Sequence, residues 1–503
     1  MLNNASTLIA AAKREPSALA IIDKGKAIDY ESLLSLSTTL GCNLLSLGLT
    51  KGSHLVTLLQ NNWQSTLIYW ACQLYGIIIT PINWRTTSEE LEYYIGDAKA
   101  EAIIFQDVSM DAVASCNFPK NIIKITIDKS KPVVLNFENL FKKISPENDF
   151  ISDEKFTSIM LYTSGTTGIG KGVPRSHSAE KSSALAHIFQ NQYAFKEKTL
   201  GVMPLYHTMG VRLLLSMCTI NGCFVCQSKF NPTESLKLIE KEKITSLYLV
   251  PTLYHDLISN NLFSSKLIKT VSKIGFAGAP MNEDLVKKLY LSFNPKVFVN
   301  HYGSTEIFTF SYKENVQTKP GSAGKAGINQ IIRVIDLESS DVKKIAEVGR
   351  EGKIIASMSS SEAFTSYWNK PESNKNSIVD GWYITGDIGY LDCEGELFIT
   401  GRIDDMIISG GENIFPVELE NILASFEGVI EAVVCGLPDE RLGEIVAAFI
   451  KSDKQINANQ LEQLFLKSKI SRFKRPRKYY FVEEIPKSPV GKILRRKLKE
   501  KYS

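Results

Sequence analysis

Short apolar runs alternate with amphipathic helical segments over most of the chain, and this alternation limits the fold more than any other sequence feature. The pattern predicts a strand at residues 54–59, a helix at 64–74 and a second strand at 76–80. The same order recurs further along the chain, where a helix is predicted at 282–293. Strands that alternate with helices favour an α/β fold with largely parallel sheets.

The length of the chain and a change of pattern predict two domains of unequal size. At ~150 residues per domain, 503 residues leave room for roughly three. A new order of helix, strand, strand and helix begins after the segment 401–405. We therefore expect a large N-terminal domain, residues 1–402, with mixed, largely parallel sheets and helices. A small mobile α+β domain, residues 403–503, would follow it.

The composition is that of an ordinary folded chain, with 44% hydrophobic and 22% charged residues. It excludes a collagen-like or wholly disordered protein, and 8 cysteines are too few for a disulfide scaffold. The spacing of Cys218, Cys223 and Cys226 is similar to an iron–sulfur pattern, but no fourth cysteine follows at a suitable distance. We interpret these cysteines as buried structural residues.

No targeting or membrane segment is predicted. The first residues lack the basic region of a secretory signal. The longest apolar stretch, residues 67–82, contains Gln73 and Gly76 and is shorter than the ~20 residues of a membrane span. The chain is therefore expected in the cytoplasm, with reduced thiols.

The charge is distributed unevenly. The net charge is +4, but the segment 467–503 alone carries 14 Lys and Arg against 3 Asp and Glu. A basic tail of this kind suits a nucleic acid, an anionic membrane or a phosphorylated ligand, and it can also be a solvated terminal helix. The tail by itself does not choose between them.

A loop rich in glycine and hydroxyl side chains follows the strand predicted at 156–162. Its sequence is Leu161-Tyr-Thr-Ser-Gly-Thr-Thr-Gly-Ile-Gly-Lys-Gly-Val173. Glycine allows backbone N–H groups to approach an anion closely, and hydroxyl groups add further donors, so the loop suits a polyphosphate. The candidate phosphate ligands are Thr163, Ser164, Gly165, Thr166, Thr167, Gly168 and Lys171.

Two phosphate-binding patterns compete for this loop. Gly165-x4-Gly170-Lys171 fulfils most of a Walker A motif, but Gly172 stands where a hydroxyl residue would hold Mg²⁺. The signature of adenylate-forming enzymes, Tyr-Thr-Ser-Gly-Thr-Thr-Gly-x-Pro-Lys-Gly, matches at every position except one, where Gly170 replaces proline. The second match is longer and more specific.

On these residues the chain resembles the acyl-activating superfamily, which includes acyl-CoA synthetases, 4-coumarate–CoA ligases and luciferases. The resemblance covers nearly the whole chain, because further family motifs occur in the expected order. They are Pro204–Gly210, Gly278–Pro280, Asn300–Glu306, Gly381–Asp387, Gly401–Asp405 and Pro486–Ile493. The resemblance implies an ATP-dependent ligase that joins a carboxylic acid to coenzyme A through an acyl-adenylate, with ATP, Mg²⁺ and coenzyme A as cofactors. Neither a nucleic acid partner nor a membrane span is expected.

The family motifs also imply roles for individual residues. Tyr302 would line the adenine, Thr305 would bond the α-phosphate, and Glu306, a hard oxygen ligand, would hold Mg²⁺. Asp387, which would work together with Arg402, would accept hydrogen bonds from the ribose hydroxyls. The other positions assigned to the nucleotide and coenzyme A are Gly278, Ala279, Pro280, His301, Gly303, Gly410 and Gly411. Gly410 and Gly411 could equally form a simple turn.

Two further catalytic roles follow from the resemblance. His207 would be a gate between the ATP and acyl sites, although a histidine in an apolar setting is more often a core residue. Lys492 would act from the C-terminal domain only when that domain closes, and the domain would swing about Asp404. The simpler interpretation of Lys492 is an ordinary cation of the basic tail.

The acyl substrate and the final acceptor stay open. The expected acyl wall is mostly apolar and suits a fatty or aromatic acid; it comprises Met209, Val211, Val250, Tyr254, Phe276 and Gly278. Arg212 either pairs with a second polar group of the substrate or, as we prefer, extends from one helix face to the surface. The phosphopantetheine of a separate acyl carrier protein is an alternative acceptor, and a P-loop NTPase is a remote alternative function.

Overall fold

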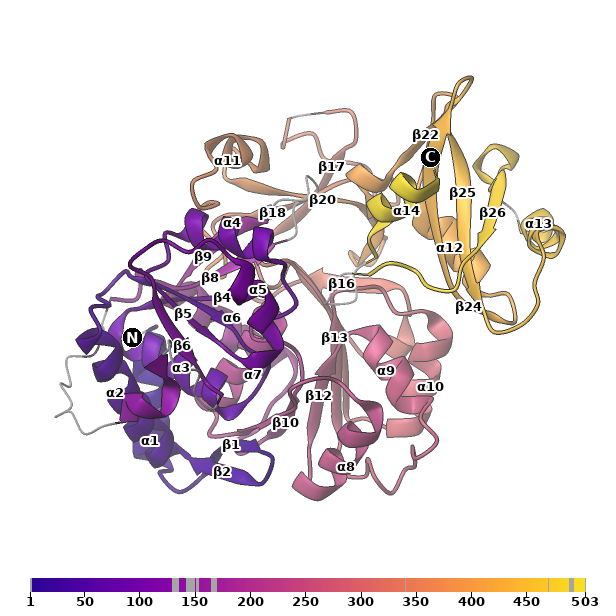
Figure 1. Ribbon diagram of the computed structural model, residues 1–503. Helices are drawn as coiled ribbons and strands as arrows, with labels where there is room; N and C mark the ends of the chain where they lie inside the picture. Colours follow the sequence, from indigo (N-terminus) through magenta and orange to yellow (C-terminus); the bar gives the residue numbers. More distant parts are fainter. Residues whose placement is uncertain are drawn as a thin grey trace. The chain divides into compact units, whose positions relative to one another are not determined.

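The computed structural model describes residues 2–128, 135–141, 150, 153–163, 170–339, 341–468, 470–487 and 493–502. The chain divides into two compact units (Figure 1). Unit 1 comprises residues 1–320, 325–331 and 357–381. Unit 2 comprises residues 321–324, 332–356 and 382–503. Residue 403, where a new domain was expected to begin, lies inside unit 2, so the proposed joint at Asp404 stays a prediction.

One sheet of unit 1 carries the glycine-rich segment at its edge. Its strand order is β7-β6-β5-β3-β4-β8-β9, and each described pair is parallel except β8 and β9. This confirms the expectation of a largely parallel sheet. The strands are β3 (His54–Leu58), β4 (Ile78–Pro81), β5 (Ala102–Phe105), β6 (Ile123–Thr126), β7 (Leu135–Asn136), β8 (Thr157–Thr163) and β9 (Lys171–Ser176).

The second sheet of unit 1 carries the later motifs. From one edge its order is β2-β1-β11-β10-β12-β13-β14-β15, and β10 to β14 pair in parallel. Its strands are β1 (Leu19–Asp23), β2 (Lys26–Asp29), β10 (Lys198–Gly201), β11 (Cys223–Cys226), β12 (Ser246–Leu249), β13 (Lys273–Ala277), β14 (Val297–Tyr302) and β15 (Ser311–Glu314).

Local capping chemistry accounts for the ends of several helices of unit 1. Asn282 accepts a hydrogen bond from the Leu285 N–H at the start of α10 (Glu283–Phe293), and Asn294 ends that helix with φ +42°. Gly76 ends α3 (Trp63–Tyr75) with φ +69°, so it is a helix cap and not, as expected, a strand residue. The other helices of unit 1 are α1 (Asn4–Arg14), α2 (Tyr30–Ser46), α4 (Ser88–Ala98), α5 (Met110–Ser115), α6 (His177–Gln190), α7 (Thr208–Thr219), α8 (Pro232–Glu242), α9 (Pro251–Ile258) and α11 (Pro371–Ser377).

Unit 2 contains two sheets. The first orders β17 (Ile332–Asp336), β18 (Gly352–Ser357), β20 (Trp382–Leu391), β21 (Leu397–Arg402) and the first residues of β16 (Ser322–Ala326), whereas β19 (Ile378–Val379) belongs to unit 1. The second consists of β22 (Ile407–Ser409), β23 (Glu412–Ile414), β24 (Val429–Asp439), β25 (Gly443–Ser452) and β26 (Lys478–Phe481). Its helices are α12 (Pro416–Ala424), α13 (Ala458–Lys467) and α14 (Arg495–Tyr502).

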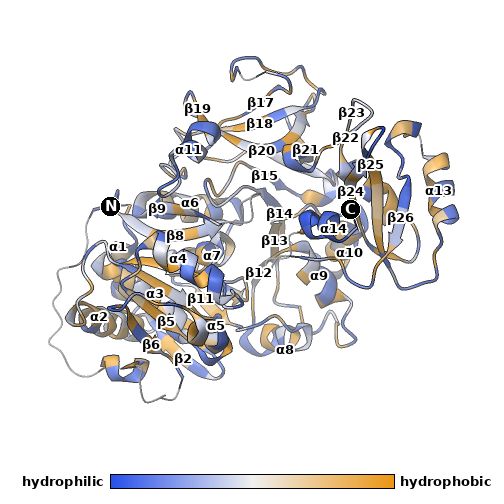
Figure 2. Cartoon of the chain, turned by 45° about the horizontal axis from the view of Figure 1, so that its top comes forward, coloured by the Kyte–Doolittle hydropathy of each residue, from blue (hydrophilic) through white to orange (hydrophobic). Residues whose placement is uncertain are grey.

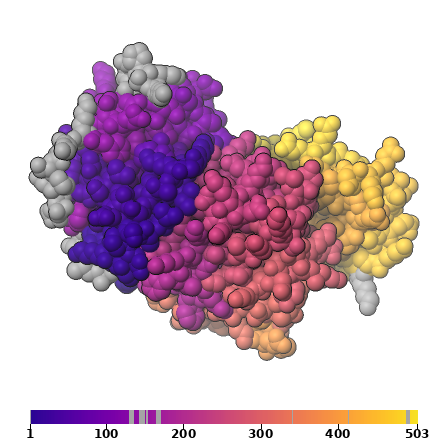
Figure 3. Space-filling model, turned by 90° about the horizontal axis from the view of Figure 1, so that it is seen from below, coloured from indigo at the N-terminus to yellow at the C-terminus, as the bar shows by residue number. Residues whose placement is uncertain are grey.

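Apolar side chains fill the space between the layers. Strands such as β5 and β18 are largely hydrophobic in Figure 2, whereas α14 is strongly hydrophilic. The N-terminal segment forms part of the surface of unit 1, where Figure 3 shows it in indigo. Within the described ranges, no helix has both the length and the apolar character needed to cross a membrane.

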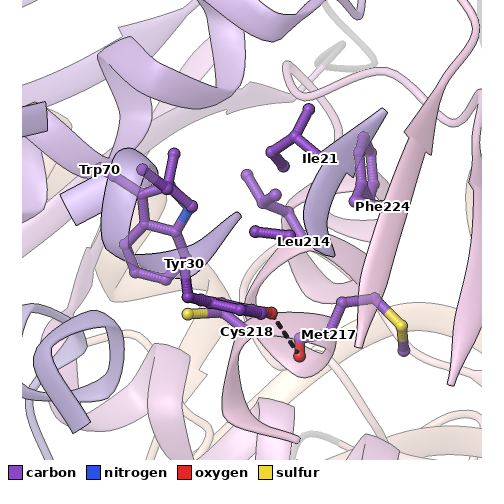
Figure 4. Close-up of a pocket in the computed structure, with 9 residues that line it drawn as sticks. Ile21, Tyr30, Trp70, Leu214, Met217, Cys218 and Phe224 are labelled. Carbon is purple, nitrogen blue, oxygen red and sulfur yellow. Dashed lines mark hydrogen bonds between the residues drawn. The ribbon is translucent and has the colours of Figure 1, made fainter. Parts of the chain in front are cut away.

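The three closely spaced cysteines are packed in this core. Cys218 and Phe224 line a small apolar gap that has no room for a water molecule, and the Tyr30 hydroxyl beside it donates to the Met217 carbonyl over 3.1 Å (Figure 4). Burial raises the pKa of the Cys218 and Cys223 thiols to about 12. The interpretation of these cysteines as buried structural residues is confirmed, because Cys218, Cys223 and Cys226 are all buried.

Buried neutral histidines make the stability of unit 1 depend on pH. His54, His177 and His301 are at most 5% exposed, and burial lowers their pKa values to about 4, 4 and 3. Between these values and the usual ~6.5, the unfolded chain binds more protons than the folded one, so stability falls as the pH drops from about 6.5 to 4.

We expect His54→Gln to reduce by about one the difference in bound protons between the unfolded and the folded chain in this range, because glutamine does not titrate. Among the described contacts, His54 Nδ1 interacts only with the Thr80 hydroxyl. Urea unfolding at pH 4.5, 5.5 and 6.5 measures that dependence. His255→Gln, at a side chain that is 57% exposed, is the control and should retain the wild-type slope. Equal slopes for all three proteins would contradict the prediction.

Candidate active site

An antiparallel hairpin frames the glycine-rich loop. Thr163, the last residue of β8, pairs directly with Lys171, the first residue of β9. A Walker A loop lies between a strand and a helix, whereas β9 is a strand. The arrangement of unit 1 therefore disfavours a P-loop NTPase. The remaining loop positions predicted to bind phosphate, Ser164, Gly165, Thr166, Thr167 and Gly168, lie outside the described residues.

The glycine that replaces the usual proline has close neighbours. A Cβ atom at Gly170 would lie 3.0 Å from Tyr94 Cε1 and 3.2 Å from the Thr163 carbonyl oxygen. The Gly170 carbonyl accepts a hydrogen bond from the Tyr93 hydroxyl over 2.9 Å. A proline would bring a Cβ into this crowded position, so the departure from the signature fits the tyrosines of this chain.

Tyr367 links the two charged groups that we assign to the triphosphate. The Lys171 ammonium lies 5.0 Å from the centre of the Tyr367 ring, and the Tyr367 hydroxyl donates to Glu306 Oε1 over 2.6 Å. Glu306 is only 6% exposed. Lys171 and Glu306, 135 positions apart, are thus brought together on one aromatic side chain. No sequence signal pointed to Tyr367, because its contact with Glu306 is formed only in the folded chain.

Tyr302 ends β14, and the turn that follows this strand presents Thr305 and Glu306. A Cβ at Gly303 would lie 1.8 Å from the Phe308 carbonyl oxygen, so only glycine fits this turn. The Ser304 N–H donates to the Ile307 carbonyl over 2.9 Å and closes it. His301 faces inward instead: its imidazole is 2% exposed and contacts Gln190 Oε1 at 3.1 Å. A direct nucleotide contact by His301 stays a prediction.

A second cluster of predicted residues lies at the start of α7. His207 caps this helix, because its Nδ1 accepts from the Met209 N–H over 3.3 Å. Gly278, with φ +87°, begins the exposed Gly278-Ala279-Pro280 turn after β13. A Cβ at Gly278 would lie 3.4 Å from Val250 Cγ1 and 3.9 Å from Met209 Sδ. The two motifs therefore meet at an apolar surface.

The rest of the expected acyl wall lies deeper. Val211 is 0% exposed. The Tyr254 hydroxyl is hydrogen-bonded in the core to the carbonyls of Leu247 and Gly275. Phe276 packs against Phe298 at 6.1 Å. The described contacts bring Met209, Val250 and Gly278 together. That Val211, Tyr254 and Phe276 belong to an acyl wall stays a prediction, and each of them is at most 2% exposed.

Arg212 does not extend to the surface, which corrects the preferred interpretation of this residue. Its side chain is 0% exposed, and its Nη2 lies 2.7 Å from Glu180 Oε1. Because a partner within the chain holds the guanidinium, the alternative of a substrate-binding arginine is also unsupported.

In unit 2, the sheet pairing brings together the two residues assigned to the ribose. Asp387 on β20 faces Arg402 on β21, and their side chains form an ion pair of 2.6 Å. Asp387 is 8% exposed, whereas the Arg402 side chain is 45% exposed. Gly410 and Gly411 have φ of +61° and +86° and form the two-residue turn of the β22–β23 hairpin. Lys492 lies outside the described residues.

The same arrangement of sequence and fold occurs in known proteins. Residues 8–368 match the profile described as "AMP-binding enzyme", and residues 418–492 match "AMP-binding enzyme C-terminal domain". The chain belongs to the AMP-binding enzyme family.

The relatives of this AMP-binding enzyme are acyl-CoA ligases. It is 30% identical to a 4-chlorobenzoate–CoA ligase of Arthrobacter over 97% of this chain and 93% of the relative. It is also 30% identical to the long-chain-fatty-acid–CoA ligase FadD13 of Mycobacterium tuberculosis, over 94% and 93%. These relatives support the chemistry of an adenylate-forming, AMP-producing acid–CoA ligase.

Solved structures agree with the fold. ATP-bound MatB from Rhodopseudomonas palustris superimposes with a TM-score of 0.90 at 26% identity, covering 99% of both chains. The o-succinylbenzoate coenzyme A synthetase MenE from Bacillus subtilis, in complex with ATP and a magnesium ion, gives 0.85 at 25% identity, covering 98% of this chain and 99% of that one. Both solved structures are mixed α/β proteins, and this AMP-binding enzyme matches each of them over nearly its full length.

Gly303→Ala tests the turn that carries Thr305 and Glu306. The added Cβ collides with the Phe308 carbonyl, so we expect about 1–3 kcal/mol of lost stability and a marked loss of ATP binding. The control is Gly96→Ala in α4, where a Cβ meets nothing within 4 Å and alanine favours the helix by about 1 kcal/mol. Thermal unfolding and ATP titration measure both variants, and wild-type ATP binding by Gly303→Ala would contradict the role of the turn.

Proposed function

We propose that this AMP-binding enzyme joins a fatty or aromatic carboxylic acid to coenzyme A. The acid would react with ATP to give acyl-AMP and pyrophosphate, and the coenzyme A thiol would then displace AMP. The observation that supports this most directly is the pair of Lys171 and Glu306 on Tyr367, beside the ends of the glycine-rich loop. A cation and a carboxylate held together suit a nucleotide triphosphate with its metal ion.

The residues at this site fit Mg²⁺. Glu306 offers carboxylate oxygens, which Mg²⁺ prefers, and Tyr367 fixes one of them through a charge-assisted hydrogen bond. When bound, Mg²⁺ would neutralise charge on the phosphates. Lys171 would hold the phosphate oxygens, Thr305 would bond the α-phosphate, and Tyr302 would pack on the adenine.

The ribose would be held by Asp387 and Arg402. The Asp387 carboxylate is fixed by the Arg402 guanidinium, and the Asp387 N–H donates to the Thr385 hydroxyl over 3.1 Å. A carboxylate in a fixed orientation can accept from both ribose hydroxyls. Gly386 has φ +78°, and a Cβ there would lie 3.0 Å from Arg402 Nη2, so glycine leaves room for the guanidinium.

The proposed joint at Asp404 has a structural basis within unit 2. Arg402 is the last residue of β21 and is held in the β20–β21 ladder. Asp405 is bonded to Arg495 over 3.1 Å, and Arg495 in turn pairs with Glu420. Only Ile403 and Asp404 separate these anchored positions, so a rotation there would move the following domain as a body and bring in or remove Lys492.

The apolar surface of Met209, Val250 and Gly278 near His207 supports the proposed substrate class, and His207 would act as a gate there. One relative acts on 4-chlorobenzoate and another on long-chain fatty acids, which agrees with an apolar acyl group.

Coenzyme A is the proposed acceptor, with Gly410 and Gly411 beside its pantetheine. The phosphopantetheine of a separate carrier protein is the second candidate, since it ends in the same thiol arm. Because ATP, coenzyme A and free thiols belong to the cytoplasm, we place the reaction there.

A pyrophosphate-release assay over a panel of carboxylic acids tests the proposal. We expect release with apolar acids in the absence of coenzyme A, and AMP with a thioester when it is added. Glu306→Ala should slow release about 100-fold, because misplaced reactants alone cost that much. ADP and phosphate as products, or an undiminished rate in folded Glu306→Ala, would contradict the assignment.

Lys492→Ala separates the two half-reactions. Negative charge accumulates between the carboxylate and the α-phosphate during adenylation, where an ammonium group helps most. We expect the variant to lose adenylate formation from acid and ATP but to convert supplied acyl-adenylate into thioester. Lys497→Ala, at an exposed cation of the same tail, is the control and should retain both steps. Equal loss of both half-reactions in Lys492→Ala would refute the role of the closed orientation.

A further inference from the structure

Three charged side chains outside the family motifs form a buried cluster in unit 1. Arg175, Glu180 and Arg212 are each 0% exposed. Glu180 Oε1 accepts from Arg175 Nε over 2.5 Å and from Arg212 Nη2 over 2.7 Å. Burial would raise the pKa of Glu180, but Arg212 and Arg175 outweigh it and hold that pKa below its usual value. The carboxylate is therefore ionised and shared by two guanidinium groups.

The rest of the Arg175 guanidinium reaches the proposed nucleotide site. Its Nη1 donates to the carbonyl oxygens of Thr305 and Glu306 over 3.0 and 2.9 Å. Its Nη2 donates to the Ser183 hydroxyl over 3.1 Å. Each donor nitrogen of Arg175 thus has a partner, and two of these four bonds hold the backbone of the residues assigned to the α-phosphate and Mg²⁺.

The cluster also joins elements that are distant in sequence. Arg175 lies on β9, four residues after Lys171, while Arg212 lies on α7, the helix that His207 caps. Glu180 and Ser183 lie on α6 between them in sequence. Arg212 Nη1 also donates to the Glu180 carbonyl over 2.6 Å, which fixes the carboxylate that orients Arg175.

We propose that Arg175 is a positioning residue for adenylation, oriented by Glu180 and Arg212. It holds the Thr305–Glu306 backbone at a fixed place relative to Lys171. The metal-binding carboxylate of Glu306 and the phosphate-binding ammonium of Lys171 therefore keep a constant distance from each other. Only arginine offers this planar fork of donors; a lysine keeps the charge but cannot bind two carbonyls and a carboxylate together. This inference rests on the proposed function, since it assigns Arg175 to the same site.

Arg175→Lys tests the proposal, with Lys273→Met as the matched control. Lys273 forms another ion pair, 2.5 Å from Glu197 and largely shielded from solvent, at the start of β13 and therefore at the opposite end of that strand from Gly278. Two quantities are measured for each folded variant: the dissociation constant of ATP with Mg²⁺ by calorimetry without any acid, and the rate of pyrophosphate release. Thermal unfolding gives the loss of stability.

We expect Arg175→Lys to weaken binding of ATP with Mg²⁺ about tenfold and to slow pyrophosphate release about 100-fold. Lys273→Met should lose thermal stability but keep both wild-type values. Arg212→Lys, which reaches Arg175 through Glu180, should change both values in the same direction and by less.

The proposal is overturned if Arg175→Lys loses only stability, as Lys273→Met does. If Arg175→Lys does not fold, Arg212→Lys and Ser183→Ala are compared by the same two measurements. Wild-type values of ATP binding and pyrophosphate release in both of these variants would overturn the proposal. A wild-type protein that binds ATP but releases no pyrophosphate with any acid would refute the proposed function, and the positioning role with it. The wild-type assay therefore tells the two failures apart.

Discussion

The antiparallel pairing of β8 with β9 determines where the charged groups of unit 1 meet. It places Lys171 opposite Thr163 at the mouth of the glycine-rich loop, and it places Arg175 further along the same strand. From there Arg175 reaches the Thr305–Glu306 turn, and Lys171 lies over Tyr367. A helix in place of β9 would direct these side chains elsewhere. The hairpin therefore distinguishes this site from a Walker A site more sharply than the missing hydroxyl at position 172.

The buried cluster of Arg175, Glu180 and Arg212 is better explained by geometry than by stability. Removing charges from water costs several kcal/mol for each ion, and a buried ion pair often stabilises a fold no more than apolar residues of similar volume. Here two guanidinium groups share one carboxylate, which makes the cluster still less favourable as a source of stability. On our proposal, the cluster fixes the distances between the three segments that carry Lys171, the Thr305–Glu306 turn and His207. A site for ATP needs such fixed distances.

Local chemistry determined which parts of the fold were predictable from the sequence. The helix at 282–293 was predicted almost to the residue because Asn282 and its apolar face signal a helix directly. The strand expected at 76–80 exists as β4, but it begins at Ile78, because Gly76 in a left-handed conformation ends the preceding helix and the apolar run alone does not show this. The motif order also placed Lys171, Thr305 and Glu306 in one site, which the contacts in unit 1 support.

Long-range contacts account for what the sequence could not show. Tyr367 meets Glu306 across 61 positions, and Arg212 meets Glu180 across 32, without any periodic pattern to indicate either contact. The preference for a surface-exposed Arg212 failed because burial of an arginine depends on a partner that only the fold supplies. Gly170 likewise departs from its signature because Tyr94, from a different segment, lies against it.

The central claim is that the acid attacks the α-phosphate of ATP. It is tested most directly by a reaction with an acid whose carboxylate oxygens are both oxygen-18, followed by mass spectrometry of the products. The account predicts one labelled oxygen in the phosphate of AMP and none in pyrophosphate, because the carboxylate oxygen stays on the α-phosphorus when coenzyme A displaces AMP. Label in inorganic phosphate, or unlabelled AMP formed together with a thioester, would contradict it.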